Sequence, residues 1–280
     1  MKKAGLYFDP KVTKYPYPEY TNQHYLTIKK DNGFVFDKDY PYFDNSKKYK
    51  NKRKRNKLIL RTMVFPLTRI YMGLKIKGKK NLKDYKVALS QGFITVSNHV
   101  HLWDYIAIMK ALKKYMMNVL VWAPNMRGSN RKMVYSVGGI PVPDSSISAS
   151  IAFQKGVEDL LNHQGHVQIY AEGSMWEYYA PIRPFKTGAS YFSIKCHKPI
   201  LPIGFSYRKP GLMAKIFHRP ADITLTIGKP LYPNPKLRGK EQEIELTRRL
   251  HATICELSHI KPEENIYPDL FDESKKIIYY

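Results

Sequence analysis

Short apolar runs alternate with longer segments of helical periodicity from residue 93 onward. Runs rich in β-branched and aromatic residues predict buried strands at 93–97, 119–122, within 133–142, and at 167–170, 200–207 and 223–227. Apolar residues three or four positions apart predict helices at 105–117, 147–161, 186–197 and 241–258. Because helices separate most of these strands, we predict an α/β fold with a mostly parallel central sheet flanked by helices.

The first part of the chain lacks this alternation. We predict that residues 1–57 form an N-terminal arm. Within it, residues 25–36 have the pattern of a β-hairpin around the turn sequence Asp31-Asn32-Gly33. The arm ends in a run of lysines and arginines, 47–57, whose charges repel one another unless an anionic partner screens them.

Residues 58–280 are then the α/β domain, which begins with an apolar stretch. Residues 58–80 combine apolar side chains with interspersed arginines, directly after the basic run. One interpretation is an amphipathic segment that lies on a membrane surface; the other is an ordinary helix that covers the core. Pro66 interrupts the helical pattern and the apolar band is wide, so the sequence leaves both interpretations open.

Charge and cysteine content indicate which partners and which cellular compartment suit the protein. The 280 residues contain 47 Lys and Arg against 23 Asp and Glu, a net charge of +24, which predicts attraction to an anionic membrane, a phosphorylated substrate or nucleic acid. Cys196 and Cys255 lack metal-ligand spacing, and we expect two buried thiols in a reducing compartment. We see neither a signal peptide nor the ~18 apolar residues of a membrane span. We therefore expect peripheral contact with the cytoplasmic face of a membrane.

Candidate chemistry lies in Ser97-Asn98-His99-Val100-His101-Leu102-Trp103-Asp104, just after the strand predicted at 93–97. Ligands bind at the carboxyl ends of strands in open α/β sheets. On a continuous helix, residues five apart lie roughly 140° from each other, so His99 and Asp104 can meet only if His99 lies in the turn before the helix. Asp104 would then orient the imidazole of His99, and the second ring nitrogen could accept a proton from a substrate hydroxyl.

Three further blocks follow along the chain. They are Gly138-Gly139-Ile140-Pro141-Val142, then Glu172-Gly173-Ser174 with Phe185-Lys186-Thr187-Gly188-Ala189 beyond it, and then Leu201-Pro202-Ile203. In this order and rough spacing, the four blocks resemble the glycerolipid acyltransferase family. Its members include the lysophosphatidic acid acyltransferases, also called 1-acylglycerol-3-phosphate O-acyltransferases. The resemblance covers roughly residues 85–232 and implies the glycerolipid acyltransferase-like form of the α/β fold.

This resemblance implies an enzyme that moves a fatty acyl group from an acyl-CoA or acyl-ACP thioester to the free hydroxyl of a lysophospholipid. The first candidate acceptor is 1-acylglycerol-3-phosphate. It implies His99 as general base and Asp104 as its orienting carboxylate, with no metal, no cofactor and no acyl-enzyme. Attack on a thioester generates an oxyanion, and backbone N–H groups around Gly138-Gly139 or around Gly173 are candidates to stabilise it.

The same resemblance assigns residues to the acceptor. It implies that the block Glu172-Gly173-Ser174 helps to bind the lipid and that Lys186 lies near its phosphate. We add Arg183, because a guanidinium can hold a phosphate through two hydrogen bonds.

Two arginines common in the family are absent. Val142-Pro143-Asp144-Ser145 stands where many members have one, and Met175 stands where they have another. Either another cation replaces them or the acceptor is a different lipid or a sugar-bearing lipid. The candidate cations are Arg127, Arg131, Arg183 and Lys186.

A non-enzymatic protein that binds RNA or DNA is the alternative from another class, since the net charge is high. The basic run 47–57 lies outside the motif region, however, and no nucleic-acid fold signature accompanies it. We therefore expect an anionic membrane surface, the acyl donor and the lysophospholipid as partners, and no specific nucleic acid.

Overall fold

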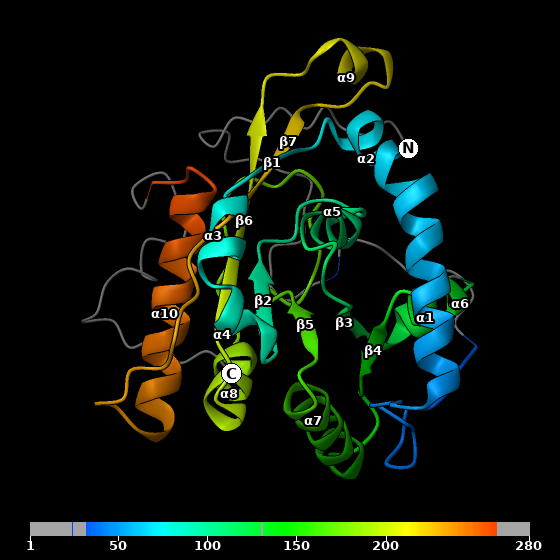
Figure 1. The fold of residues 1–280 in the computed structure, drawn as a ribbon, viewed down its shortest axis with the longest axis vertical. Coiled ribbons are helices and arrows are strands. Elements are labelled where there is room, and N and C mark those ends of the chain that lie inside the picture. The colour runs from blue at the N-terminus through cyan, green and yellow to red at the C-terminus, as the bar shows by residue number, and fades with distance from the viewer. Residues whose placement is uncertain (1–23, 25–31, 130, 262–280) are drawn as a thin grey trace.

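A seven-stranded sheet forms the centre of the protein (Figure 1). The computed structural model describes residues 24, 32–129 and 131–261. The strands lie in the order β1-β7-β6-β2-β5-β3-β4, and neighbours are parallel except for β6 and β7. Their bounds are β1 Lys75–Lys77, β2 Phe93–Ser97, β3 Met117–Trp122, β4 Gly139–Val142, β5 His166–Ile169, β6 Ile200–Arg208 and β7 Asp222–Ile227. The predicted α/β class with a mostly parallel sheet is confirmed.

Helices cover both faces of the sheet. One core contains α7 (Ile147–Asn162), α8 (Gly188–Cys196) and α10 (Gly239–Leu257). The other contains α2 (Phe65–Met72), α4 (Lys86–Ser90) and α5 (Asp104–Ala111). Side chains of a strand alternate between its two faces, so Ile94 of β2 packs into the first core and Phe93 into the second. The remaining helices are α1 Lys47–Ile59, α3 Lys79–Asp84, α6 Arg131–Ser136, α9 Leu212–Ile216, the π-helical η1 Leu60–Val64 and the 3₁₀-helical η2 Ala123–Met126.

Most predicted elements are present, with ends shifted by a few residues. The main error concerns the helix predicted at 105–117, because α5 ends at Ala111 and a turn follows. Leu112 is buried from that turn, and Met117 is buried as the first residue of β3. The apolar spacing was therefore that of a helix, a turn and a strand that share one core.

The predicted hairpin is only partly testable, because residues 25–31 lie outside the described part of the chain. Residues 34–36 form no strand. Phe36 is instead buried, with its ring centre 4.9 Å from that of Tyr40, and its carbonyl accepts a hydrogen bond from the hydroxyl of Tyr42 at 3.0 Å. This part of the arm thus packs as an irregular aromatic cluster.

The basic run forms α1, which continues through η1 into α2. The division predicted at residue 57 falls inside α1. At the end of η1 the N–H of Phe65 donates to the carbonyl of Leu60, five residues back, and the π-type turn admits Pro66 near the start of α2 without a break in the helical path. In the described part of the chain, no helix has the length and apolar character needed to cross a membrane.

Side-chain hydrogen bonds fix the carboxyl end of β2. The amide of Asn98, the first residue beyond β2, exchanges two hydrogen bonds with the backbone of Phe205 on β6, at 3.0 and 2.8 Å. On the other side, Gln168 of β5 donates to the hydroxyl of Ser97 at 3.0 Å and accepts from that of Thr95 at 2.6 Å. The turn that carries His99 therefore starts from a rigid edge.

Candidate active site

His99 and Asp104 are in direct contact at the carboxyl end of β2. Nδ1 of His99 lies 3.0 Å from Oδ2 of Asp104. His99 lies in the turn before α5 and Asp104 is the first residue of that helix, as their spacing requires. The side chain of Asp104 is 0% exposed and that of His99 is 20% exposed. The predicted contact is present, and the catalytic roles stay predictions.

Three hydrogen bonds converge on one oxygen of Asp104. Besides the imidazole, Oδ2 accepts the backbone N–H groups of Val100 at 2.7 Å and His101 at 2.9 Å. With a carboxylate acceptor at Nδ1, the ring hydrogen belongs on that nitrogen and Nε2 keeps its lone pair. Among the described residues, none forms a hydrogen bond with Nε2 of His99. That atom is available to a substrate hydroxyl.

Burial favours the uncharged forms of both groups. It lowers the pKa of His99 to about 3, against the opposing effect of the nearby Glu172 carboxylate. It raises the pKa of Asp104 to about 7, and no described residue offers a hydrogen bond to Oδ1 of Asp104. The imidazole is therefore neutral near pH 7, which is the state that a general base requires.

Tyr170 packs flat against the imidazole of His99. The two ring centres are 3.7 Å apart and the ring planes differ by 12°. Tyr170 directly follows β5, the neighbour of β2 in the sheet. Its hydroxyl is buried with no hydrogen-bond partner in the described part of the chain, and burial followed by the charge of Asp104 raises its pKa. The stack restricts rotation of the His99 side chain and keeps the ring facing Asp104.

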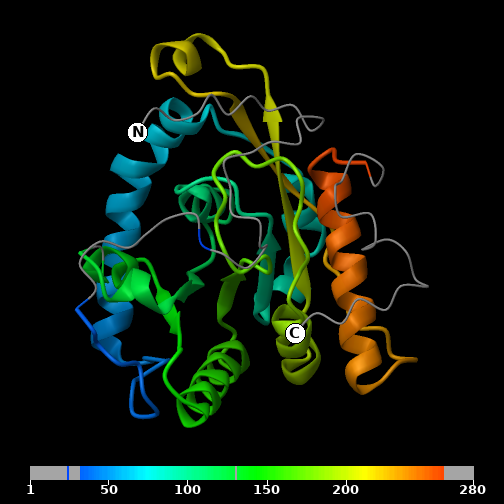
Figure 2. The ribbon, with the colours of Figure 1, turned by 180° about the vertical axis from the view of Figure 1, so that it is seen from behind.

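The loop between β5 and α8 passes over the ends of the strands (Figure 2). Two of its backbone N–H groups bond to the His99 turn: Trp176 donates to the carbonyl of His99 at 3.2 Å, and Tyr178 to that of Val100 at 2.7 Å. The loop and the turn therefore form one rigid unit.

Within this loop, Glu172 and Arg183 form a buried ion pair. One carboxylate oxygen of Glu172 accepts the backbone N–H of His99 at 2.8 Å, and the other accepts Nε of Arg183 at 2.8 Å. The guanidinium also donates to the hydroxyl and the carbonyl of Ser174 and lies over the ring of Trp176. Arg183 is only 1% exposed. This placement argues against the predicted phosphate contact: Arg183 holds Glu172, and Glu172 holds the backbone of the candidate base.

Gly173 and Lys186 lie on the exposed side of the same loop. Gly173 has φ of +80°, a conformation that glycine adopts without strain, and a Cβ there would come within 3.2 Å of the Lys186 amine. The backbone N–H of Lys186 is fixed by the carbonyl of Ala171 at 2.9 Å. Lys186 thus presents an accessible positive charge next to the Glu172 block.

The other two arginines considered as phosphate ligands, Arg127 and Arg131, contact the N-terminal arm instead. Arg127 pairs with Asp144, with Nη1 3.0 Å from Oδ2, and its Nε donates to the carbonyl of Phe34 at 2.7 Å. Arg131 lies over the ring of Phe34, 4.5 Å from its centre. Their charges are engaged in these contacts.

Three of the candidate oxyanion donors, the N–H groups of Gly138, Gly139 and Gly173, are not placed to bind an oxyanion beside His99. Gly138 and Gly139 lie at the start of β4, which is the amino edge of the sheet and not the edge that carries His99. The N–H of Gly173 donates to the carbonyl of Tyr170 at 2.9 Å and is not free to bind an oxyanion.

Sequence reasoning also missed two aromatic residues near the base, Tyr170 and His24. Tyr170 appeared only as the last apolar residue of a strand, although its position directly before the Glu172 block was a usable signal. His24 stacks on Trp122 with ring centres 3.7 Å apart. Its pKa is lowered by burial and then by the charges of Lys186, Arg183 and His99, so it lies within electrostatic range of the site. No sequence pattern marked it.

The cysteines are buried free thiols, as expected. Burial raises the pKa of Cys196 to about 11 and that of Cys255 to about 12, which keeps both thiols protonated at neutral pH. In the described part of the chain, no three His, Cys, Asp or Glu side chains are grouped to hold a metal ion.

A buried His–Asp pair at the carboxyl edge of an α/β sheet can activate a hydroxyl, with the imidazole as the base. Residues 73–206 match the family model described as Acyltransferase, so the chain carries an acyltransferase domain and the predicted family is confirmed. No curated protein sequence matches the chain. The fold is similar to that of the 1-acyl-sn-glycerophosphate (LPA) acyltransferase PlsC from Thermotoga maritima. The TM-score is 0.50 at 17% identity, covering 76% of this chain and 83% of that one.

The stack of Tyr170 on His99 generates the first prediction. Tyr170→Ala should lower kcat for acyl transfer roughly 10- to 100-fold, because the imidazole can then rotate away from Asp104. Tyr170→Phe keeps the ring and removes only an unpartnered hydroxyl, so its kcat should stay close to wild type. Steady-state kinetics on folded variants measure this. Equal losses in both variants would contradict an orienting role for the ring.

The raised pKa of Asp104 generates the second prediction, which concerns the pH dependence of the reaction. A carboxyl group whose pKa is raised to about 7 takes up a proton as the pH falls through that value. Protonation weakens the acceptor at Nδ1 of His99, so kcat/KM should be high above pH 7 and fall below it. Asp104→Asn should be slower at every pH and lack this acid limb, since an amide does not titrate and the pKa of His99 lies far lower. An unchanged acid limb in Asp104→Asn would disprove the assignment.

Proposed function

We propose that this acyltransferase moves a fatty acyl group from acyl-CoA or acyl-ACP to the free hydroxyl of a lysophospholipid, with 1-acylglycerol-3-phosphate as the leading acceptor. The observation that carries the proposal is a neutral His99 whose Nδ1 faces Asp104 and whose Nε2 has no partner among the described residues. A lipid hydroxyl has a high pKa and needs a base at the moment of attack, typically worth about 10² to 10⁴ in rate.

The reaction then proceeds in one transfer. Nε2 of His99 accepts the hydroxyl proton as the oxygen attacks the thioester carbonyl, and Asp104 stabilises the imidazolium that forms. The tetrahedral intermediate collapses with breakage of the C–S bond, and the imidazolium returns its proton to the thiolate. The products are the ester and the free thiol. The thioester already carries the activation, so the proposed step uses no metal and no cofactor.

Lys186 is the proposed phosphate ligand. It is exposed beside Gly173, whereas Glu172, Ser174 and Arg183 are buried and bonded to one another. A cation of this kind can replace one of the arginines that the family usually places near the acceptor. Without the second arginine, a lysolipid with another head group, or a sugar-bearing lipid, is the alternative acceptor.

The third prediction concerns the reaction itself. Purified protein is incubated with an acyl thioester and, separately, with 1-acylglycerol-3-phosphate, lysophosphatidylcholine and a sugar-bearing lysolipid, and the products are weighed by mass spectrometry. We expect phosphatidic acid to form fastest. His99→Ala should lower the rate at least about 10²-fold, whereas the exposed His163→Ala should not.

Lys186→Ala tests the acceptor in the same assay. It should raise KM for the phosphorylated acceptor about tenfold with a smaller change in kcat, because it removes a charge-assisted contact to the ground state. Lys195→Ala on α8 is the matched control. Faster acylation of an unphosphorylated acceptor would disprove 1-acylglycerol-3-phosphate as the leading acceptor. Wild-type turnover in His99→Ala would disprove His99 as the general base.

We propose further that the enzyme works on the cytoplasmic face of an anionic membrane. Exposed apolar side chains occur along α1, η1, α2, α9 and the turn before α5, and we call this set the apolar band. The members of this apolar band are Leu58, Ile59, Met63, Leu67, Tyr71, Leu102, Leu212, Met213, Ile216 and Phe217. Figure 1 and Figure 2 show α2 and α9 together at one end of the molecule. The ring of Tyr71 stacks on Phe217 and on Trp103, the residue before Asp104, so the apolar band leads to the candidate active site.

A basic cavity next to the apolar band supports the same proposal. It has a volume of about 710 Å³, and its lining includes the apolar residues Phe65, Leu82 and Leu112. Every charged residue that lines it is basic: Arg61, Lys79, Lys83, Lys86, Lys110, Lys113 and Lys114. Apolar side chains beside a group of cations match an anionic lipid surface, in which head groups lie above acyl chains.

The fourth prediction tests this membrane contact. Met63→Glu with Leu67→Glu should lower binding to vesicles that contain phosphatidylglycerol by about tenfold or more, since two charges then enter the apolar layer. Ile147→Glu changes an apolar residue on α7 that is also exposed but lies outside the apolar band, and this variant should bind like wild type. Sedimentation with vesicles measures both. A loss of the same size in the control would show that the apolar band is not the contact.

A further inference from the structure

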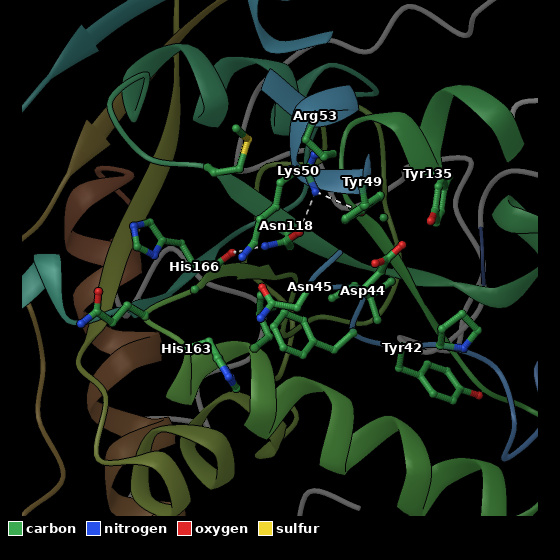
Figure 3. A pocket seen from close by; sticks show the side chains of 18 of the residues that line it. Tyr42, Asp44, Asn45, Tyr49, Lys50, Arg53, Asn118, Tyr135, His163 and His166 are labelled. Atoms are coloured by element: carbon green, nitrogen blue, oxygen red, sulfur yellow. Dashed lines mark hydrogen bonds between the residues drawn. The ribbon is translucent and has the colours of Figure 1, made fainter. Parts of the chain in front are cut away.

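A second pocket lies at the amino edge of the sheet, opposite the edge that carries His99. It has a volume of about 380 Å³ and is formed by α1, the first residues of β3, β4 and β5, and the end of α7 (Figure 3). Arg53 and Lys50 reach into it from α1, and Asn118 of β3 and His166 of β5 lie across from them. Arg53, Lys50, Asn118 and His166 lie outside the motif blocks and take no part in the proposed reaction.

Arg53 is a buried cation without a carboxylate partner. It is 5% exposed. Its Nη1 donates to the amide oxygen of Asn118 at 2.8 Å and to the hydroxyl of Tyr49 at 3.2 Å, and its Nη2 donates to the carbonyl of Met117. All three acceptors are neutral, and no acidic side chain in the described part of the chain forms an ion pair with Arg53. A buried charge of this kind is unfavourable unless an anion compensates it.

Another buried arginine of the same chain, Arg183, shows how such a charge is usually compensated. Arg183 is buried to a similar degree, and Glu172 compensates its charge at 2.8 Å. Arg53 differs in that its charge borders an open pocket instead of a carboxylate. The difference indicates that the counter-ion of Arg53 comes from outside the described chain.

Other charges around the pocket also favour an anionic ligand. Lys50 and Lys54 from α1 and Lys114 from the turn before β3 line it, all with exposed side chains. The one carboxylate in the lining is that of Asp44, which accepts the N–H of Ser46 at 2.9 Å. The positive charges therefore exceed the negative ones, which favours a ligand with more than one negative charge.

Aromatic rings form the walls on both sides. Tyr49 and Tyr135 lie with ring centres 5.3 Å apart, and Phe43 and His163 lie at the same separation on the other side. Figure 3 shows Tyr49 beside Arg53, with Tyr135 and His163 toward opposite ends of the pocket. Such faces favour a planar, unsaturated ring.

We propose that this pocket binds a small molecule that joins a phosphate group to a planar ring, the chemistry of a nucleotide. Arg53 and Lys50 bind the phosphate, and the aromatic walls bind the ring. The site is separate from the catalytic edge, and the proposal does not depend on the acyl-transfer reaction.

The experiment is a calorimetric titration of the purified full chain with AMP, in which adenosine and inorganic phosphate are the comparison ligands. AMP should bind more tightly than either part alone. The double variant Lys50→Ala/Lys54→Ala changes only exposed side chains and should weaken AMP binding about tenfold or more. Lys79→Ala/Lys83→Ala removes the same charge from α3, and Lys186→Ala removes a charge at the catalytic edge; both should bind AMP like wild type.

Different results would disprove different parts of the proposal. Equal weakening by the two lysine pairs would mean that net charge alone attracts AMP, and equal binding of adenosine would mean that Arg53 contributes nothing. Absence of saturable AMP binding in the millimolar range would overturn the proposal. Arg53→Met should abolish binding; if that variant does not fold, the Lys50→Ala/Lys54→Ala result decides.

Discussion

The edge of the sheet that carries His99 depends on one buried carboxylate, that of Glu172. It joins the backbone of His99, 73 residues away in sequence, to the guanidinium of Arg183. Removal of one partner from a buried ion pair typically costs about 3–5 kcal/mol, because the remaining charge is left without compensation. The position of the His99 backbone is therefore linked to the stability of the whole loop between β5 and α8.

Two different interactions then control the side chain of the same histidine. Asp104 acts locally, since a helix start places its carboxylate next to the preceding turn and its N–H groups. Tyr170 acts from the neighbouring strand and limits rotation of the ring. Backbone, ring direction and ring plane are thus fixed by three separate residues. Such fixed geometry matters because a base contributes to the rate only when it already faces the reacting hydroxyl.

The parts that sequence reasoning predicted are those set by local rules. The contact of His99 with Asp104 follows from helix geometry over five residues, and the strands follow from short apolar runs. The role of Arg183 depends on a loop that folds back across 11 residues to Glu172, and no periodicity describes such a loop. The sequence therefore offers only the chemistry of Arg183 as a guide to its role, and a guanidinium suits a phosphate and a buried carboxylate equally well.

The basic run 47–57 shows that charge in the sequence, too, does not reveal which side chains face the body of the protein. As a helix, α1 directs Tyr49, Arg53 and Asn56 to one face, at positions four and three residues apart, and all three bond to the body of the protein or to one another. This inward face is polar, so a search for apolar periodicity does not detect it. Some of the basic residues of the described chain line the pocket beside α1, and others line the cavity beside α3 or lie near His99. These places differ in burial and neighbours, so a count of lysines in the sequence cannot assign a single partner to all of them.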